Sequence, residues 1–184
     1  MPFTAEPYRL PGLLLISGRV VPDERGFFQE GYRADEFLAF GVPPLVQDNM
    51  SRSRRGVVRG LHFQKPPRPQ GKLVRCVRGR ILDVAVDIRR GSPTFGKWAS
   101  VELSDEANRL LWIPAGFAHG FCALSEQADV TYKVTEYFSA AHDAGIRWND
   151  PALAVAWPDC AAVMSEKDRR LPLLQEADSG FTWS

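Results

Sequence analysis

Cysteine is scarce in this sequence of 184 residues, and neither sign of charge dominates it. The three cysteines, Cys76, Cys122 and Cys160, are odd in number and far apart, which argues against a disulfide framework and a CxxC metal site. The first two lie among apolar neighbours and are expected to be small core residues. The formal net charge is only +1, and this balance argues against a general nucleic-acid binder or a polybasic membrane protein.

A long hydrophobic run is also missing from the early part of the chain. The longest apolar stretch there, residues 13–16, is much shorter than a membrane span or the core of a secretory signal peptide requires. Unpaired thiols fit a reducing compartment. We therefore expect a cytoplasmic protein without a membrane partner.

Several catalytic signatures have no match in the sequence. It contains no GxSxG elbow that would expose a serine nucleophile. It contains neither a GxGxxG turn nor a Walker phosphate loop, so a dinucleotide cofactor and an NTPase site are unsupported.

The balanced total charge conceals a basic middle segment. Residues 52–90 contain twelve basic and two acidic residues, a net charge of +10, whereas the rest of the chain contains eleven basic and twenty acidic residues. Three explanations are open at this point: an anionic ligand, an acidic partner surface, or an ordinary solvated strand face.

Short β-type runs separated by turn residues fill most of the chain, as in an all-β sandwich or closed barrel. We expect strands at 13–21, 72–79, 80–88, 97–103, 109–114, 119–125 and 129–137, with a turn at 23–26. A helix is expected at 34–41, and Pro172 limits any helix that starts near Ser165 to one or two turns. Glycine and proline are scattered rather than pooled in a linker, so residues 1–184 are predicted to form a single domain.

Polar side chains that point into a small barrel would mark a ligand site. Gln47, Asn49 and Ser51 recur at every second position, so they share one face of a strand. This face is either the exposed face of an edge strand or a row of ligand contacts inside the barrel. Tyr132 shares its face with two valines and is expected to point inward, either as a core residue with a bonded hydroxyl or as a proton donor in a dry pocket.

The sequence has only three histidines, and the imidazole group titrates near neutral pH, which suits a general base. His62 lies on an expected strand, and His142 lies in an expected loop and is given no role. His119 ends the string PAGFAH, which resembles the second metal-site motif of cupins, a class of small double-sheet β-barrels. Metal-binding cupins also supply an HxH pair, but LHFQ offers one histidine only, so we predict no metal.

Two further side chains fit an acid–base site around His62. Lys72 opens a strand, either as a surface cation or as a group that stabilises negative charge on a substrate oxygen. Asp168 could orient the His62 ring and stabilise its protonated form, but sequence alone does not bring the two together. Asp83 lies on the less apolar face of the run 80–88 and is given no role.

Eight strings of residues carry a specific resemblance to a known family. They are DERGFFQEGY (23–32), VQDNMSRS (46–53), VVRGLHFQ (57–64), QGKLVRCVRGRILDVAVDIRRGSPTFGKW (70–98), LWIPAGFAHGF (111–121), TYKVTEYFS (131–139), WNDP (148–151) and SEKD (165–168). With these strings the chain resembles the dTDP-4-dehydrorhamnose 3,5-epimerase family from about residue 10 to residue 174. The resemblance implies a mainly β, cupin-like double-sheet jelly-roll barrel with a few short peripheral helices, no metal and no cofactor.

The resemblance also implies roles for the matching residues. His62 matches the general base, Asp168 its carboxylate partner, Tyr132 the general acid, and Lys72 the lysine beside the enolate oxygen. The positions that match nucleotide-sugar contacts are Arg25, Glu30, Gln47, Asn49, Arg59, Lys72, His119, Asp143 and Lys167.

The implied reaction converts dTDP-4-dehydro-6-deoxy-alpha-D-glucose to dTDP-4-dehydro-beta-L-rhamnose by inversion at C3 and C5, in dTDP-L-rhamnose biosynthesis. Both carbons are next to the C4 keto group, so an enolate mechanism needs no redox cofactor. The family is typically homodimeric, with strands exchanged between barrels. Two departures from its pattern bear on affinity and selectivity: Phe138 replaces a common tyrosine, and Asp143 replaces a common glutamate.

Three alternatives stay open. The chain could be an epimerase of a related pathway that inverts only C3 or only C5, and the departure at Phe138 leaves this alternative open. A cupin-like sugar-binding protein without turnover would have no need of a matched acid and base. A metal-dependent cupin isomerase or oxygenase would need the missing HxH pair.

Overall fold

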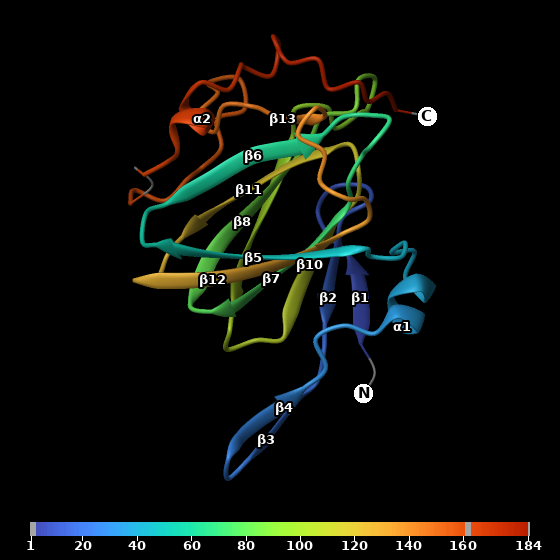
Figure 1. Cartoon of the computed structure of the whole chain (residues 1–184), viewed down its shortest axis with the longest axis vertical. Coiled ribbons are helices and arrows are strands. Elements are labelled where there is room, and N and C mark those ends of the chain that lie inside the picture. The colour runs from blue at the N-terminus through green and yellow to red at the C-terminus, as the bar shows by residue number, and fades with distance from the viewer. Residues whose placement is uncertain (1–2, 161–162, 184) are drawn as a thin grey trace.

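Two antiparallel β-sheets face each other in the computed structural model, which describes residues 3–160 and 163–183 (Figure 1). The six-stranded sheet has the order β1 (Thr4–Pro7), β2 (Leu14–Ser17), β10 (Arg109–Ile113), β7 (Lys72–Arg78), β12 (Gln127–Val134) and β5 (Gln47–Arg54). The five-stranded sheet has the order β13 (Asp143–Gly145), β6 (Val58–Gln64), β11 (Phe117–Ala123), β8 (Arg80–Asp87) and β9 (Trp98–Ser104). The mainly β, cupin-like barrel predicted from the sequence is confirmed.

The space between the sheets holds the main hydrophobic core. Its residues alternate along their strands, because successive side chains of a strand point to opposite faces. Val74 of β7, Ile81 and Ala85 of β8, and Val130 of β12 are all fully buried in this core. Several of the remaining inward-facing positions are polar, and these line the cavity described below.

Both sheets are also covered on their outer faces. Val84 and Val86 of β8 pack on Leu153 and Leu174 from the C-terminal part of the chain. This second layer buries the apolar face of the run 80–88, and the core between the sheets buries the opposite face. On the outer face of the six-stranded sheet, Phe37 belongs to a third buried cluster.

Two short helices lie at the periphery. The helix α1 (Ala34–Ala39) matches the expected helix at 34–41, and Gly41 follows it with a φ of +84°, a conformation that glycine adopts at little cost. The helix α2 (Glu166–Arg169) is a single turn whose first N–H groups are capped by the Ser165 hydroxyl, which accepts from the Asp168 backbone N–H at 3.1 Å. No helix in residues 3–160 and 163–183 is long and apolar enough to cross a membrane.

The single strand predicted at 13–21 is wrong. It is divided into β2 and β3 (Val20–Asp23), with Gly18 between them at a position where a Cβ would meet the side chains of Phe3 and Asn108. β3 pairs only with β4 (Gly26–Gln29) in a two-stranded hairpin. Figure 1 shows this hairpin projecting away from the barrel, and its tip is the turn expected at 23–26.

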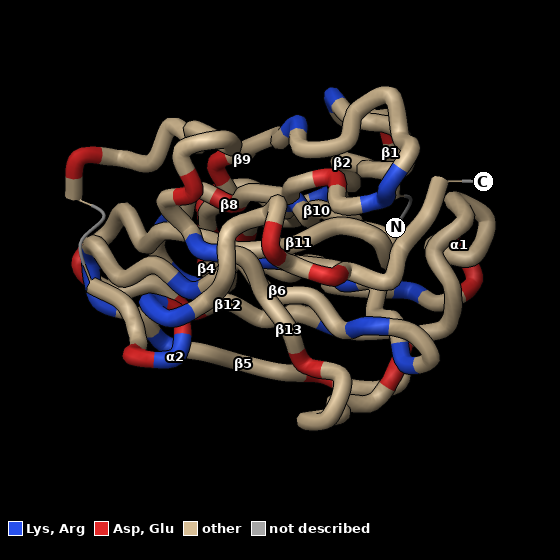
Figure 2. Tube along the Cα trace, turned by 90° about the horizontal axis from the view of Figure 1, so that it is seen from above, with Lys and Arg blue, Asp and Glu red and all other residues tan. Residues whose placement is uncertain are grey.

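The basic residues of the segment 52–90 do not form one patch. Figure 2 shows acidic and basic positions interleaved along the trace. Five of the basic residues form ion pairs with carboxylates: Arg52 with Asp129, Lys65 with Asp178, Arg68 with Glu136, Arg80 with Glu102, and Arg89 with Asp87. Two others, Arg59 and Lys72, face the barrel interior. The segment is therefore mostly ordinary solvated surface, with a small cationic contribution to one cavity.

Candidate active site

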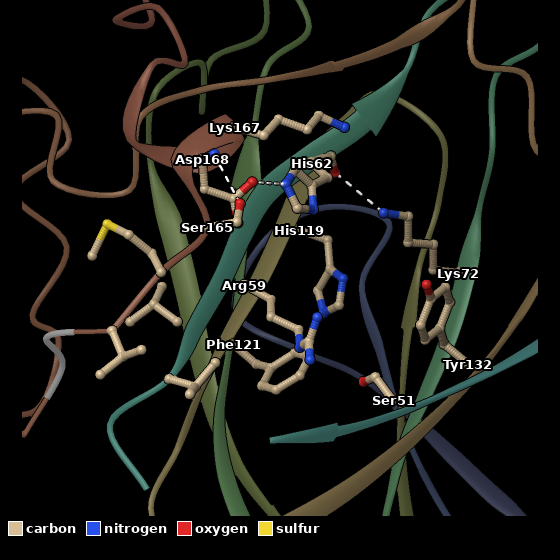
Figure 3. Close-up of a pocket in the computed structure, with 14 residues that line it drawn as sticks. Ser51, Arg59, His62, Lys72, His119, Phe121, Tyr132, Ser165, Lys167 and Asp168 are labelled. Atoms are coloured by element: carbon tan, nitrogen blue, oxygen red, sulfur yellow. Dashed lines mark hydrogen bonds and ion pairs between the residues drawn. The ribbon is translucent and has the colours of Figure 1, made fainter. Parts of the chain in front are cut away.

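A cavity of about 440 Å³ opens into the barrel and brings together side chains from both sheets (Figure 3). Its walls are formed by Ser51, Val57, Val58, Arg59, His62, Lys72, His119, Phe121, Tyr132, Val163, Met164, Ser165, Lys167 and Asp168. A second cavity of about 390 Å³ shares four of these residues, His62, Lys72, Tyr132 and Lys167. The two cavities are therefore parts of one site.

His62 and Asp168 form a hydrogen-bonded pair on the cavity wall. Nε2 of His62, on β6, lies 2.7 Å from Oδ1 of Asp168, on α2. The Asp168 side chain is only 6% exposed. Burial alone raises the pKa of this carboxyl group. The hydrogen bond with His62 and the charge of the ring lower the pKa by more than burial raises it, so the net pKa lies below the usual range. An ionised Asp168 thus fixes the ring through Nε2 and leaves Nδ1 for a substrate.

Lys72, the first residue of β7, is a buried cation beside this pair. Its Nζ donates to the backbone carbonyl oxygen of His62 at 3.2 Å. Desolvation lowers the pKa of the Lys72 ammonium group to about 8, against the smaller opposing effects of the Asp143 and Asp83 charges. Lys72 is therefore charged at neutral pH but close to losing its proton. The surface-cation alternative does not hold for a side chain at this depth.

Tyr132 faces the cavity from β12, as its alternation with the neighbouring residues predicted. Figure 3 shows its hydroxyl on the far side of the cavity from the pair of His62 and Asp168, with the Lys72 ammonium group between them. Burial raises the pKa of the Tyr132 phenol, with Arg59 opposing this shift. The phenol is therefore protonated at neutral pH and is able to donate a proton.

The polar face of β5 points inward. Gln47 and Asn49 line the second cavity, and Ser51 lines the first. The Gln47 side chain is held at both ends: its Nε2 donates to Oδ1 of Asn49 at 2.8 Å, and its Oε1 accepts from the backbone N–H of Phe138 at 2.9 Å. β5 is an edge strand, but the alternative that this face is exposed and without a ligand-facing role is wrong, because it lines the two cavities.

Asp143 and Lys167 complete the rim of the second cavity. Asp143 opens β13, which pairs with β6 so that Asp143 lies opposite Gln64. Its carboxylate forms an ion pair with the Lys167 ammonium group of α2. Asp143 and Lys167, two predicted contacts that are 24 positions apart, are thus brought to the same opening.

His119 and Arg59 line the first cavity from β11 and β6. The Arg59 side chain is fixed by a hydrogen bond from Nε to Oγ of Ser53 at 2.9 Å. Nε2 of His119 lies 2.5 Å from Oδ1 of Asp83, which is fully buried. Sequence reasoning missed Asp83. The available signal was a carboxylate in the middle of a strand whose opposite face is continuously apolar.

Arg25 and Glu30 are not brought to the cavity of their own chain. Among the described residues, neither lines either of the two cavities. Arg25 lies in the turn of the hairpin of β3 and β4, with its side chain 84% exposed and paired with Asp23 at 2.7 Å. Glu30 directly follows this hairpin.

A metal site has no support from side-chain positions. Within residues 3–160 and 163–183, no three His, Cys, Asp or Glu side chains cluster closely enough to hold an ion. The metal-free expectation remains a prediction, based on the missing HxH pair.

These features define a class of protein: a cupin-like barrel whose interior carries a histidine–carboxylate pair, a lysine and a tyrosine suited to acid–base chemistry. The sequence matches the family model of dTDP-4-dehydrorhamnose 3,5-epimerase over residues 7–176. It is 52% identical to the Pseudomonas aeruginosa dTDP-4-dehydrorhamnose 3,5-epimerase over 172 residues, which cover 92% of this chain and 94% of that protein. It is 50% identical to the Salmonella typhimurium enzyme over 171 residues, covering 91% and 93% of the two chains.

Comparison with solved structures indicates the same family. The dTDP-6-deoxy-D-glucose-3,5-epimerase of Legionella pneumophila, in complex with dTDP-4-keto-L-rhamnose, has a TM-score of 0.95 and 42% sequence identity, with both chains covered completely. This chain belongs to the dTDP-4-dehydrorhamnose 3,5-epimerase family and is an isomerase.

Proposed function

We propose that this enzyme inverts C3 and C5 of dTDP-4-dehydro-6-deoxy-alpha-D-glucose through enolates, with His62 as the base and Tyr132 as the acid. The observation that carries the proposal is the placement of these two groups on opposite sides of one cavity (Figure 3). Family membership supports the substrate class, a dTDP-linked 4-keto-6-deoxy sugar.

Proton removal begins at His62. Asp168 binds Nε2 of the ring, so Nδ1 takes the proton from a carbon next to the C4 keto group. The ionised carboxylate then stabilises the imidazolium ion that forms. Asp168 therefore acts through His62 rather than on the sugar.

The enolate formed in this step carries negative charge on O4. Lys72 supplies a buried positive charge, and an interaction of this kind is strong where water is excluded. Tyr132 then returns a proton from the opposite face of the sugar ring, which inverts the carbon. The same base and acid serve C3 and C5 if the sugar ring shifts between the two events.

The activity should fall at alkaline pH as Lys72 loses its charge. Because the pKa of Lys72 is about 8, kcat/KM should fall about tenfold for each pH unit above that value. A pH–rate profile measures this limb. In Lys72→Arg the guanidinium group stays charged, so the residual activity should lack the limb. An unchanged limb in that variant would assign it to another group.

The nucleotide is placed in the second cavity by this scheme. Gln47 and Asn49 offer hydrogen-bonding groups there, and Phe138 offers an aromatic ring. Lys167, which lines both cavities, and Arg59, which lines the first, offer cations for the diphosphate between nucleoside and hexose. Asp143 orients Lys167 through their ion pair. Phe138 lacks the hydroxyl of the tyrosine common at this position, which removes one ligand contact and leaves the acid and base unchanged.

Arg25 and Glu30 reach a substrate only if a second copy of the chain supplies them, so we propose a homodimer. The projecting hairpin carries Phe27 and Phe28, which are 59% and 62% exposed. β5 is an edge strand of the six-stranded sheet and carries the cavity residues Gln47 and Asn49. A hairpin from the partner that docks along this open edge would bury its aromatic rings and bring Arg25 to the cavity.

Mixed dimers test this arrangement. Arg25→Ala and His62→Ala should each have low activity alone, but co-expressed chains should recover about a quarter of the wild-type rate, because half of random dimers contain one complete site. The matched control combines His62→Ala with Tyr132→Phe, whose residues belong to the same chain's site, and should show no recovery. No recovery in the first mixture would mean that Arg25 does not act across a dimer.

We also propose that residues 1–184 form one domain, since the core between the sheets draws residues from Leu10 to Val130. A cytoplasmic location is proposed from the free cysteines, which fit a reducing compartment.

The function is tested by incubating the enzyme with dTDP-4-dehydro-6-deoxy-alpha-D-glucose and reading the product by NMR. Inversion at both carbons is expected. Inversion at C3 alone or C5 alone would establish the single-centre alternative, and binding without turnover would establish a sugar-binding protein.

A further inference from the structure

We propose that Asp83 is a positioning residue that holds Nε2 of His119 and so directs Nδ1 of His119 to a hydroxyl group of the hexose. The proposal rests on the function proposed above and adds a second histidine–carboxylate pair to the same cavity. Its task is to bind the hexose beside the reacting carbons, whereas the pair of His62 and Asp168 moves protons.

The two histidines occupy directly paired positions. His119 of β11 lies opposite His62 of β6 in the antiparallel register. Side chains at such positions stand on the same face of the sheet with their Cβ atoms about 5 Å apart. Because His62 must reach C3 and C5, a side chain beside it lies at the hexose rather than at the diphosphate.

The two rings are held in the same way. Each binds a buried carboxylate through Nε2, at 2.7 Å for His62 and 2.5 Å for His119. Asp168 comes from α2, whereas Asp83 comes from β8, the strand next to β11. Among the described residues Nδ1 of His119 has no hydrogen-bond partner, and the side chain lines the cavity. Nδ1 is therefore the atom that meets a ligand.

Burial separates the two pairs. The His62 side chain is 30% exposed, whereas those of His119 and Asp83 are 8% and 0% exposed. A hexose hydroxyl both donates and accepts hydrogen bonds, so it suits Nδ1 in either protonation state of the ring, whereas a diphosphate only accepts.

The buried carboxylate of Asp83 is incompletely hydrogen-bonded, which is energetically unfavourable. Its second oxygen, Oδ2, is buried and has no hydrogen-bond partner in the described part of the chain. Buried carboxylate oxygens are rarely left unpaired, and the exceptions in native proteins call for an explanation. Its contact with His119 provides one, since orienting that ring requires a carboxylate inside the sheet.

The test measures hexose binding and nucleotide binding separately. In Asp83→Leu the KM for the nucleotide sugar should rise about tenfold or more, while the dissociation constant for dTDP, which lacks the hexose, stays unchanged. In Asp83→Asn, an oxygen acceptor for the Nε2 proton remains, so the rise in KM should be smaller. An equal loss of dTDP affinity would overturn the proposal.

A double-mutant cycle with His119→Asn shows whether Asp83 acts through His119. Once His119 is absent, Asp83→Leu should raise KM no further, whereas additive effects would contradict a positioning role. Should Asp83→Leu fail to fold, ring ¹⁵N NMR of the wild type decides the matter: Nε2 of His119 must carry a proton, and a ring protonated only on Nδ1 would overturn the proposal. Wild-type turnover is measured first, since its absence would refute the proposed function while the NMR result would still stand.

Discussion

His62→Ala is expected to abolish exchange of the C3 and C5 hydrogens with solvent deuterium. Loss of a positioned general base lowers a rate by about 10²–10⁴-fold, and the neighbouring ring, His119, is assigned to a hexose hydroxyl rather than to the reacting carbons. The exchange is measured by NMR of the nucleotide sugar in deuterated water. Exchange at the wild-type rate would end the assignment of His62 as the base.

Asp168→Asn is the matched control for this substitution. Asparagine keeps the shape of the side chain but removes the charge that stabilises the protonated ring, so exchange should slow without being abolished. dTDP binding should be retained in both variants, because the proposed role of both residues is at the reacting carbons of the hexose. Loss of dTDP binding in His62→Ala would point to a disturbed fold rather than a missing base.

Tyr132→Phe is expected to separate proton removal from proton return. The ring still packs against the core between the sheets, but the hydroxyl that donates the proton is lost. The yield of inverted product should fall by about 10²–10⁴-fold, while deuterium still enters the recovered substrate because His62 returns a proton from the original face.

The two rates must be compared in one sample. Exchange that persists while inversion is lost assigns the acid to Tyr132. Epimerisation at the wild-type rate would remove Tyr132 as the donor, and equal loss of exchange and inversion would mean that the hydroxyl is needed for binding or for enolate formation.

The alternation of residues along single strands was enough to predict much of the fold and part of the site. The inward face of Gln47, Asn49 and Ser51 and the inward placement of Tyr132 follow from a period of two residues. The strand predicted at 13–21 failed because its two halves pair with different strands, β2 with β1 and β10 and β3 with β4 alone. Local pattern does not report such contacts.

Pairs of site residues were harder to predict than single ones. His62 and Asp168 are 106 positions apart, and only the docking of α2 against β6 brings them together. Asp83 was missed because its partner, His119, lies on another strand. Arg25 was the hardest residue to predict, since within the described part of its own chain it lines neither cavity.

A crystal structure with a bound dTDP-linked 6-deoxy sugar tests the central claim most directly. The hexose is predicted to lie in the first cavity, with the His62 ring and the Tyr132 hydroxyl on opposite faces of the sugar ring and the Lys72 ammonium group at O4. A hexose bound outside this cavity, or one that meets both groups on the same face, would contradict the proposed mechanism.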